Sequence, residues 1–542
     1  MKIRPVFWLI PAAILLVGAA FFATGGFGLL RASAPESGAS PVVEVAGSVA
    51  ETVGTPLAMG APREQIPTRA ANVAATPTAS LTAKPTALEE TGPAEAAQLP
   101  VVANTATPGP TVAPDVATEF TSVRPGQVLG SIAARYGVAM NKIVEYSNIE
   151  DPDFLSLGQG LIVPHKTDRM TPDEVLLPDS ELVFGPAYVD FDLEKFIEQQ
   201  GGYLSQFSMS GLNGEEWGAA DVIERVALRY SVGPRVLLSV MESRSGWVTD
   251  PAPEGLALDY PLGHYGGAPG LLSQLEWTAN ELNRGYYGWQ DRGETAMRSK
   301  DGNIARGAPG LNPATVAVQR VLAADSDWND LESELARFSD TYQRLFGDPM
   351  ALDTGPVQPA LDSQPQMQLP FSAAEWWYLT GGPHGGWGSG SGWSALDFVP
   401  HDAGIGNCFP ADSWAVAVAP GVVARNDSGE ILLDLDGDGD ARTGWVLQYL
   451  HITDRVAEGD LLETGDRVGR PSCEGGAAES THLHISRRYN GLWVAADGPV
   501  PFVMDGWQAW GDFEYDGGLL KAGEPAREAC NCRDRLRNGL SW

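Results

Sequence analysis

The placement of histidine is the feature that most constrains this chain. Five of its seven histidines fall between residues 384 and 484, in a stretch that otherwise consists of short strand-like segments and glycine-rich turns. The sharpest pattern there is Thr481-His482-Leu483-His484-Ile485. Side chains two apart on a strand project from the same face, so the two imidazoles point into one site while the leucine and isoleucine face a core. The pattern predicts a β domain with a histidine site on one face of a sheet.

A second short strand and a carboxylate supply the rest of a metal-ligand set. Residues 445–451 end in His451, and Asp397 lies among apolar neighbours that make an unpaired charge expensive. Two imidazoles and one carboxylate, with a fourth position left for water, form the ligand set that a catalytic zinc ion needs. The remaining imidazoles are then free to hold that water and the developing oxyanion. We therefore predict a metal site, although a lone histidine is more often structural.

These residues resemble the LytM-type zinc endopeptidases, and most closely their β-lytic or staphylolysin branch. The lysostaphin branch has a histidine four residues before its aspartate, where this chain has Trp393. In the β-lytic branch the histidine lies thirteen residues before the aspartate, and His384 stands at that spacing from Asp397. Further matching strings are Gln368-Leu369-Pro370, Tyr449-Leu450-His451, Cys473-Glu474-Gly475-Gly476, His482-Leu483-His484 and Tyr489-Asn490-Gly491.

The resemblance implies an all-β, antiparallel zinc endopeptidase domain over residues 366–515. By position, it implies that His384, Asp397 and His484 bind Zn²⁺. It also implies that His451 and His482 assist catalysis.

The chain departs from the family at two kinds of position. Thr481 stands where many members have proline, which alters a turn and leaves the ligands intact. The family's bridge partner for Cys473 is missing from its usual strand, and Cys408 is the nearby substitute, so the resemblance suggests a Cys408–Cys473 disulfide.

Two further segments of this region carry weaker signals. Residues 516–542 are predicted to be a C-terminal tail, whose Cys530 and Cys532 are so close in sequence that a bond between them implies strain. Residues 434–440 copy the first half of a calcium loop, but Trp445 occupies the place where a bidentate glutamate is expected. We favour an acidic hairpin tip without an ion over a calcium site.

Residues 119–166 predict a small βααβ module. Apolar residues from Leu129 to Tyr136 follow helical spacing, a second helix starts near Ile143, and short strands flank the pair. The segment resembles a LysM domain at Gly126, Tyr136-Gly137-Val138, Asn148, Leu155, Gly158, Gln159, Leu161, Val163 and Pro164. The resemblance implies binding to N-acetylglucosamine-containing polymers, in an exported bacterial protein most often peptidoglycan. The alternative is a spacer that no longer binds glycan.

Residues 170–350 are rich in helical patterns. Residues 221–232 carry one apolar face, and Pro234 opens a second apolar helix that ends near Glu242. An acid at the end of a buried helix, beside Trp247, resembles a lysozyme-like or lytic transglycosylase fold, in which Glu242 would protonate a glycosidic oxygen. The alternative, which we favour, is a helical domain whose glutamate caps a helix or forms a local salt bridge.

The N-terminal part of the chain predicts export. An uncharged run from Pro5 to Leu30 follows Lys2 and Arg4 and is long enough to cross a hydrocarbon layer about 30 Å thick. Residues 1–30 are therefore a transmembrane signal anchor or a signal peptide, and both place the rest outside the cytoplasmic membrane. Residues 31–118, rich in Ala, Thr and Pro, are predicted to be a disordered linker.

Together these patterns predict a multidomain protein with a βααβ LysM domain, a mainly α lysozyme-like middle domain and an all-β antiparallel metallopeptidase domain. Its 36 basic and 69 acidic side chains give a net charge of −33, which argues against nucleic-acid binding. We expect an exported peptidoglycan hydrolase in the cell envelope or outside the cell, held at the membrane by its N-terminal segment, that cleaves peptide cross-links. The alternatives are a non-catalytic wall-binding regulator and glycan-strand cleavage through Glu242.

Overall fold

The computed structural model describes residues 115–542 apart from 157, 212–213 and 512. The predicted signal segment 1–30 and nearly all of the predicted linker 31–118 lie outside these residues. Within the described part of the chain, no helix is both long enough and apolar enough to cross a membrane.

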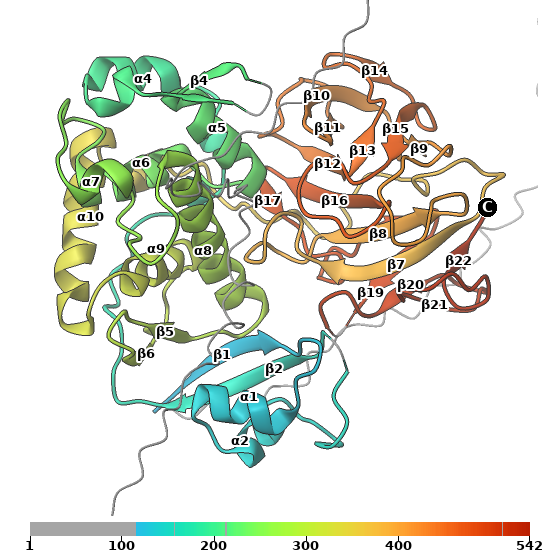
Figure 1. Ribbon diagram of the computed structural model, residues 1–542, viewed down its shortest axis with the longest axis horizontal. Coiled ribbons are helices and arrows are strands. Elements are labelled where there is room, and N and C mark those ends of the chain that lie inside the picture. Colours follow the sequence, from blue (N-terminus) through green and yellow to red (C-terminus); the bar gives the residue numbers. More distant parts are fainter. Residues whose placement is uncertain (1–114, 157, 212–213, 512) are drawn as a thin grey trace, which may run out of the picture. The chain divides into compact units, whose positions relative to one another are not determined.

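The first described module has two antiparallel strands with two helices between them (Figure 1). Its elements are β1 Val116–Ser122, α1 Leu129–Tyr136, α2 Met140–Tyr146 and β2 Gly160–Lys166. The strand β1 begins before residue 119, so the predicted linker extends too far. Ala117 and Thr118 are buried and lie opposite His165 and Pro164 of β2, and sheet pairing therefore orders them.

The middle of the chain is mainly helical. Its longer helices are α4 Leu193–Gln200, α5 Ala219–Tyr230, α6 Pro234–Ser245, α8 Leu271–Asp291, α9 Pro313–Ala324 and α10 Leu331–Phe346. Its shorter helices are α3 Asp179–Leu182, α7 Leu256–Asp259, η1 Pro186–Tyr188, η2 Tyr203–Gln206, η3 Trp328–Asp330 and η4 Pro349–Leu352, and its hairpins are β3 Ser208–Ser210 with β4 Glu216–Gly218 and β5 Ala296–Arg298 with β6 Ile304–Arg306. Pro234 at the first position of α6 suits a helix start, because its missing N–H has no partner there in any case. The apolar faces of α5, α6, α8 and α9 meet in one core.

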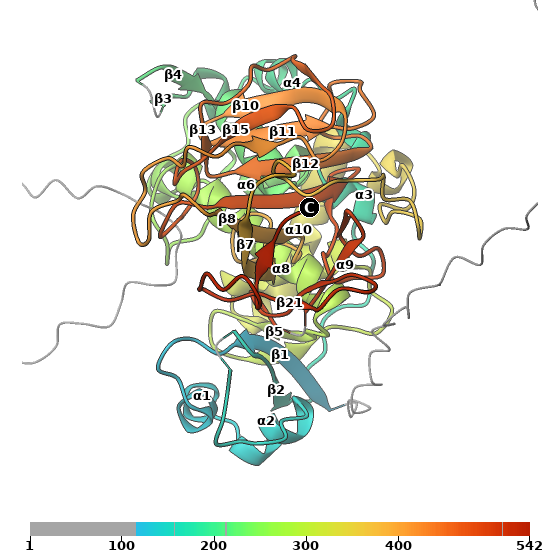
Figure 2. The same cartoon turned by 90° about the vertical axis from the view of Figure 1, so that its right-hand side faces the viewer.

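A nine-stranded antiparallel sheet dominates the C-terminal part (Figure 2). Its spatial order is β14-β10-β11-β12-β16-β8-β7-β22, and β17 pairs with β16. The strands are β7 Trp377–His384, β8 Ala395–Pro400, β10 Gly421–Asp427, β11 Glu430–Asp434, β12 Trp445–Leu450, β14 Leu461–Leu462, β16 Leu483–Tyr489, β17 Leu492–Trp493 and β22 Gly539–Leu540. Two smaller sheets consist of β13 Ile452–Thr453, β15 Arg467–Pro471 and β9 Ala415–Val416, and of β18 Val503–Met504, β19 Trp507–Trp510, β20 Gly518–Leu520 and β21 Arg527–Glu528.

The two faces of the main sheet have different partners. On β16, Leu483 and Ile485 are fully buried in the core of the β domain, as their alternation with the histidines predicts. The opposite face carries His484 and, further along β16, meets the helix α5. There the Arg488 side chain donates a hydrogen bond of 2.6 Å to the carbonyl of Leu228. The face that carries the histidine site is therefore partly covered by the helical region.

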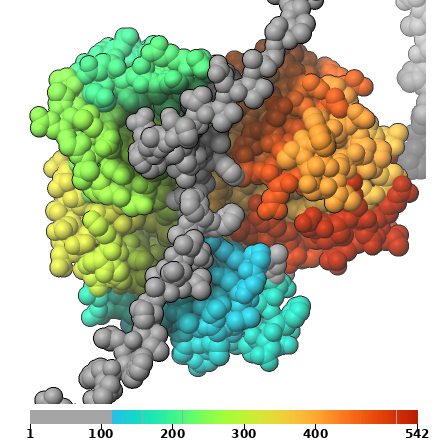
Figure 3. All heavy atoms as spheres, viewed as in Figure 1, coloured from blue at the N-terminus to red at the C-terminus, as the bar shows by residue number. Residues whose placement is uncertain are grey.

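The predicted C-terminal tail is wrong, because residues 516–542 are part of the β domain. The strand β22 pairs with β7, and Leu540 within it is 1% exposed. Figure 3 shows the C-terminal residues, in red, packed against the orange part of the chain. Cys530 and Cys532 are joined to each other. The strands β20 to β22 have only two or three residues each, too few to show the alternation by which a strand is recognised in sequence.

Candidate metal centre

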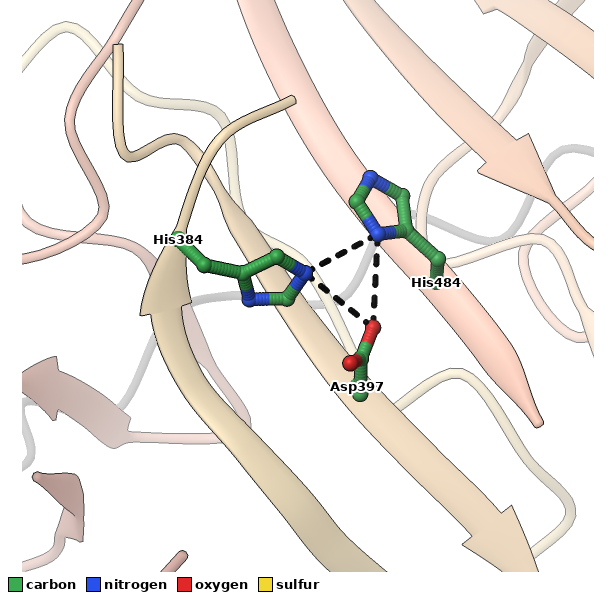
Figure 4. A group of neighbouring side chains, drawn as sticks. All are labelled: His384, Asp397 and His484. Carbon is green, nitrogen blue, oxygen red and sulfur yellow. Dashed lines mark hydrogen bonds and ion pairs between the residues drawn. The ribbon is translucent and has the colours of Figure 1, made fainter. Parts of the chain in front are cut away.

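Three side chains of ligand type converge on the sheet (Figure 4). His384 is the last residue of β7, Asp397 lies within β8, and His484 lies directly opposite Asp397 on β16. Nε2 of His384 and Nδ1 of His484 are 3.1 Å apart, and each lies 3.3 Å from Oδ1 of Asp397. Residues 100 positions apart in sequence therefore present three potential ligand atoms to one point.

Hydrogen bonds to the backbone fix which nitrogen of each ring faces that point. Nδ1 of His384 donates to the carbonyl of Gly382 at 2.8 Å, and Nε2 of His484 donates to the carbonyl of Gly386 at 3.1 Å. In its neutral form, each ring therefore has its lone pair on the nitrogen that faces Asp397. Carbonyl groups that accept the outer N–H of a histidine in this way are typical of metal-bound imidazoles.

One oxygen of the Asp397 carboxylate is buried without a hydrogen-bond donor. This atom, Oδ1, has no hydrogen-bond partner among the described residues. Burial alone would raise the pKa of Asp397, but the neighbouring His384 and His482 hold that pKa well below its usual range. Converging lone pairs repel one another unless a proton or a metal cation lies between them. Two nitrogens and one oxygen in this arrangement fit a divalent zinc ion.

A glycine makes room for this carboxylate. A Cβ atom at Gly381 would lie 2.7 Å from Oδ2 of Asp397, closer than real Cβ atoms come to their neighbours. Gly381 faces Asp397 across the β7–β8 pair, between the two irregularities in its register. The glycine-rich end of β7 therefore allows the strand to approach the carboxylate closely.

The other two predicted histidines lie beside the three ligand-type residues. His482 directly precedes β16, its Nδ1 donates to the carbonyl of Ser480 at 2.7 Å, and its Nε2 lies 3.7 Å from Oδ1 of Asp397. The ring of His451 lies 4.5 Å from the ring of His482, centroid to centroid. Burial, together with His482 and His484, lowers the pKa of His451 to about 3, which keeps this imidazole neutral.

Tyr515 also belongs to this site and is missed by sequence reasoning. Its ring stacks on His384 with 4.1 Å between centroids and 18° between planes. Burial, together with Asp397, raises the pKa of Tyr515 above its ordinary value. Tyr515 comes from the loop before β20, which has no strand pattern that would place it against β7.

The Cys408–Cys473 disulfide suggested by the family resemblance is present, with sulfurs 2.13 Å apart. It lies next to the histidine site, because Cys473 precedes Glu474, whose carbonyl accepts a hydrogen bond of 3.2 Å from Nδ1 of His451.

Two other acidic residues singled out in the sequence have ordinary partners. Asp434 lies at the end of β11, where its carboxylate accepts hydrogen bonds from the N–H groups of Asp436, Gly437 and Gly439. Glu242 accepts hydrogen bonds from Val248, Thr249 and the Arg344 guanidinium. Glu242 thus has a local salt bridge, while ligand atoms of Asp434, Asp436 and Asp438 also lie within 4.8 Å of one another, so calcium binding there stays untested.

Comparison with known proteins gives two family matches. Residues 122–164 match the LysM domain model, and residues 175–359 match the model of the LasA N-terminal domain. Protease LasA from Pseudomonas aeruginosa is 27% identical over 342 residues, which span 59% of this chain and 75% of that protein. The chain is a relative of the LytM-type peptidases and carries a LysM domain.

Two further proteins are each similar to one part of this chain. The N-acetylmuramoyl-L-alanine amidase XlyA from Bacillus subtilis is 40% identical over 57 residues, which span 10% of this chain and 19% of the amidase. The solved structure of the deep-sea M23 metalloprotease pseudoalterin is 26% identical and spans 31% of this chain and 96% of its own, with a TM-score of 0.26. The LasA N-terminal model covers the region for which the sequence suggests a lysozyme-like fold.

Proposed function

We propose that this protein is an exported zinc-dependent endopeptidase that cleaves peptide cross-links in peptidoglycan. The observation that carries the proposal is the buried Oδ1 atom of Asp397, which faces two imidazole lone pairs and has no hydrogen-bond donor. A buried acceptor of this kind is expensive unless a cation neutralises it. The relationship to the LytM-type peptidases supports the reaction type.

In this proposal His384, Asp397 and His484 hold the ion. Zinc in such a ligand set acts as a Lewis acid, which makes water a nucleophile near neutral pH and polarises a carbonyl group. The carbonyls of Gly382 and Gly386 keep both rings in the tautomer that presents a lone pair. The backbone carbonyls therefore orient both rings so that each turns its inner nitrogen toward the proposed ion.

His451 and His482 are proposed to handle protons and to orient the reacting groups. The Nδ1 atom of each ring donates to a backbone carbonyl, that of Glu474 or of Ser480, which leaves Nε2 of each ring as an acceptor. Nε2 of His482 lies on the side of Asp397 and is placed to accept a proton there. A neutral His451 is proposed to orient the reacting groups through a hydrogen bond to its Nε2 atom.

The substrate and the location follow from the other parts of the chain. A LysM domain supports binding to the N-acetylglucosamine-containing glycan of peptidoglycan, while the β domain acts on its peptide stems. The relationship to LasA and the LysM match support a place outside the cell or in its envelope. The negative charge of the chain gives no basis for a nucleic-acid partner. Attachment to the membrane through residues 1–30 stays a prediction.

We do not propose glycan cleavage through Glu242. A general acid needs a proton on its carboxyl group and an open path to the glycosidic oxygen. The carboxylate of Glu242 instead accepts hydrogen bonds from Thr249 and pairs with Arg344 at 2.9 Å. These contacts engage both oxygens of the carboxylate within the helical region.

The test is product analysis after digestion of purified peptidoglycan by the full chain. We expect new free amines with the wild type and none with His484→Ala, while both proteins still sediment with wall material. Glu242→Gln is the matched control and should release amines like the wild type. Anhydro sugar ends in place of amines would identify a glycan-cleaving enzyme. Binding without any product would identify a non-catalytic regulator.

A further inference from the structure

Both proposed catalytic histidines are held by segments that lie outside the main sheet. We propose that a covalent brace positions His451 and His482 for the reaction. The brace consists of two segments, residues 407–409 and residues 472–474, together with Thr481. The Cys408–Cys473 disulfide joins the two segments. This inference rests on the proposed function, because it concerns how the two imidazoles are held for peptide hydrolysis.

The first observation is that His451 lies between β12 and β13 and is held by residues outside both strands. Its φ of 61° lies in the left-handed region, which a residue with a Cβ atom adopts rarely. Its carbonyl accepts hydrogen bonds from the N–H and the hydroxyl of Ser472, at 2.6 Å and 3.1 Å. Its ring is oriented by the carbonyl of Glu474. Both the backbone and the ring of His451 therefore depend on residues 472–474.

The second observation is that both segments of the brace also hold the chain at His482. The N–H of His482 donates to the carbonyl of Ser472 at 3.3 Å. Thr481 donates its N–H to the carbonyl of Asn407 at 2.9 Å and its hydroxyl to the carbonyl of Phe409 at 2.7 Å. A proline at this position, as many LytM-type members have, would lack both donors. The threonine therefore makes a contact that proline cannot make.

The third observation is the position of the disulfide within these contacts. Cys408 lies between Asn407 and Phe409, whose carbonyls hold Thr481. Its partner Cys473 lies between the two residues that hold His451. The loop 401–412 has little apolar anchorage at its tip, because Ile405 and Phe409 are 85% and 77% exposed. A loop with few buried contacts opens easily, so the covalent bond adds to the hydrogen bonds of Ala411 with Arg470 and Pro471 in keeping the brace closed.

The ligand-type residues do not depend on this brace. His384, Asp397 and His484 belong to β7, β8 and β16, which hydrogen bonds of the main sheet join directly. Loss of the brace should therefore displace the two flanking imidazoles and leave zinc binding in place. Because a displacement of about 1 Å at a catalytic group can lower a rate about 100-fold, we expect kcat to fall about 10- to 100-fold. KM and zinc content should stay close to those of the wild type.

The experiment compares full-length variants on a soluble peptide substrate. Cys408→Ser/Cys473→Ser opens the brace, and Cys530→Ser/Cys532→Ser removes the other disulfide of the same domain as a matched control. Thr481→Val removes the hydroxyl donor of the brace, and Thr481→Ser keeps a hydroxyl at this position. We expect the large loss of kcat only in the first double variant, a smaller loss in Thr481→Val, and recovery in Thr481→Ser. Zinc content and the ring resonances of isotope-labelled His451 and His482 are measured in parallel.

Several outcomes would overturn the proposal. One is a kcat within two-fold of the wild type when the brace is open, and another is an equal loss in the control double variant. A parallel fall of zinc content and kcat would show that the disulfide supports the metal centre as a whole. If the wild type releases no amines, the proposed function fails and the resonances decide alone. Sharp, unshifted signals of His451 and His482 in the open variant would then disprove the brace.

Discussion

Asp397 and Glu242 are both largely buried acids, and they differ in what surrounds their oxygens. Glu242 receives four hydrogen bonds: from Val248 N–H at 3.1 Å, from Thr249 N–H and hydroxyl at 3.1 Å and 2.6 Å, and from Arg344 at 2.9 Å. Oδ1 of Asp397 has imidazole nitrogens at 3.3, 3.3 and 3.7 Å, and in all three rings the other nitrogen donates to a backbone carbonyl. One acid is already satisfied by hydrogen bonds within the helical region, and Oδ1 of the other has no hydrogen-bond donor among the described residues.

The comparison teaches how a ligand can be told from a structural acid. Both residues sit in apolar strings, Val240-Met241-Glu242 and Ala395-Leu396-Asp397, and both can be proposed as catalytic from sequence. The number of hydrogen-bond donors that reach each carboxylate separates them, because a satisfied buried acid gains nothing from a metal ion, whereas an unsatisfied one does.

The largest effect should come from removing the unsatisfied acid. Asp397→Ala deletes one of three proposed ligands, so zinc affinity should fall by more than the roughly 10- to 100-fold that loss of an outer-shell partner costs. Glu242→Gln should leave that affinity unchanged. Competition with a chromophoric chelator measures both. Equal zinc affinity in Asp397→Ala and the wild type would show that this carboxylate is not a ligand.

The second effect is zinc-dependent stability. A ligand that binds only the folded state at 100 times its Kd stabilises that state by about 2.7 kcal/mol. We expect zinc to raise the thermal midpoint of the wild type and of Glu242→Gln, and to have no such effect on Asp397→Ala. Thermal unfolding at several zinc concentrations, with chelator added back, provides the measurement. A shift that persists in Asp397→Ala would place the responsible ion elsewhere.

Much of this centre could be predicted from the sequence. Strand alternation placed both His482 and His484 on the side away from the core, and the apolar neighbours of Asp397 marked it as a charge in need of a partner. The residues alone could not say which two imidazoles would share a ligand set, because that choice depends on which ring nitrogens the carbonyls of Gly382 and Gly386 leave free. The resemblance to a family supplied the proposed assignment.

Other parts could not be predicted, for physical reasons. Tyr515 reaches His384 from a loop whose path depends on the short strands that follow it, and strands of two or three residues have no detectable period. The same absence of pattern made the C-terminal segment look like a tail. The hydrogen bonds to Glu242 come from the turn at Val248 and Thr249 and from Arg344, whose positions depend on helix packing.

A third effect tests the satisfied acid. The glutamine in Glu242→Gln cannot accept all four hydrogen bonds, because its amide nitrogen is a donor and would face other donors. We therefore expect the free energy of opening of α6 to fall by about 1 to 3 kcal/mol. Arg344→Ala should cost less than about 1 kcal/mol, since the Arg344 side chain is 53% exposed. Native-state hydrogen exchange of the α6 amides measures both. A negligible effect of Glu242→Gln would mean that these bonds contribute little, and the contrast with Asp397 would weaken.

The smallest effect concerns Asp434, an acid of intermediate kind, which has three N–H donors but also a like-charged neighbour. Burial, together with Asp436, raises the pKa of Asp434 to about 6 from its ordinary 3.8. The folded state then binds more protons than the unfolded state between these values, so this contribution to stability is complete below about pH 3.8 and is lost as the pH rises through about 6. As the pH rises through about 6, we expect the free energy of unfolding of the wild type to decrease by about 1 kcal/mol. This decrease should be absent in Asp434→Asn. Exchange protection of the Gly437 and Gly439 amides, corrected for intrinsic rates, should therefore be greater at pH 5 than at pH 7. If millimolar calcium restored that protection at pH 7, the loop would be a cation site, as is proposed for Asp397. No effect of calcium would place Asp434 with Glu242, among acids that their own loops satisfy.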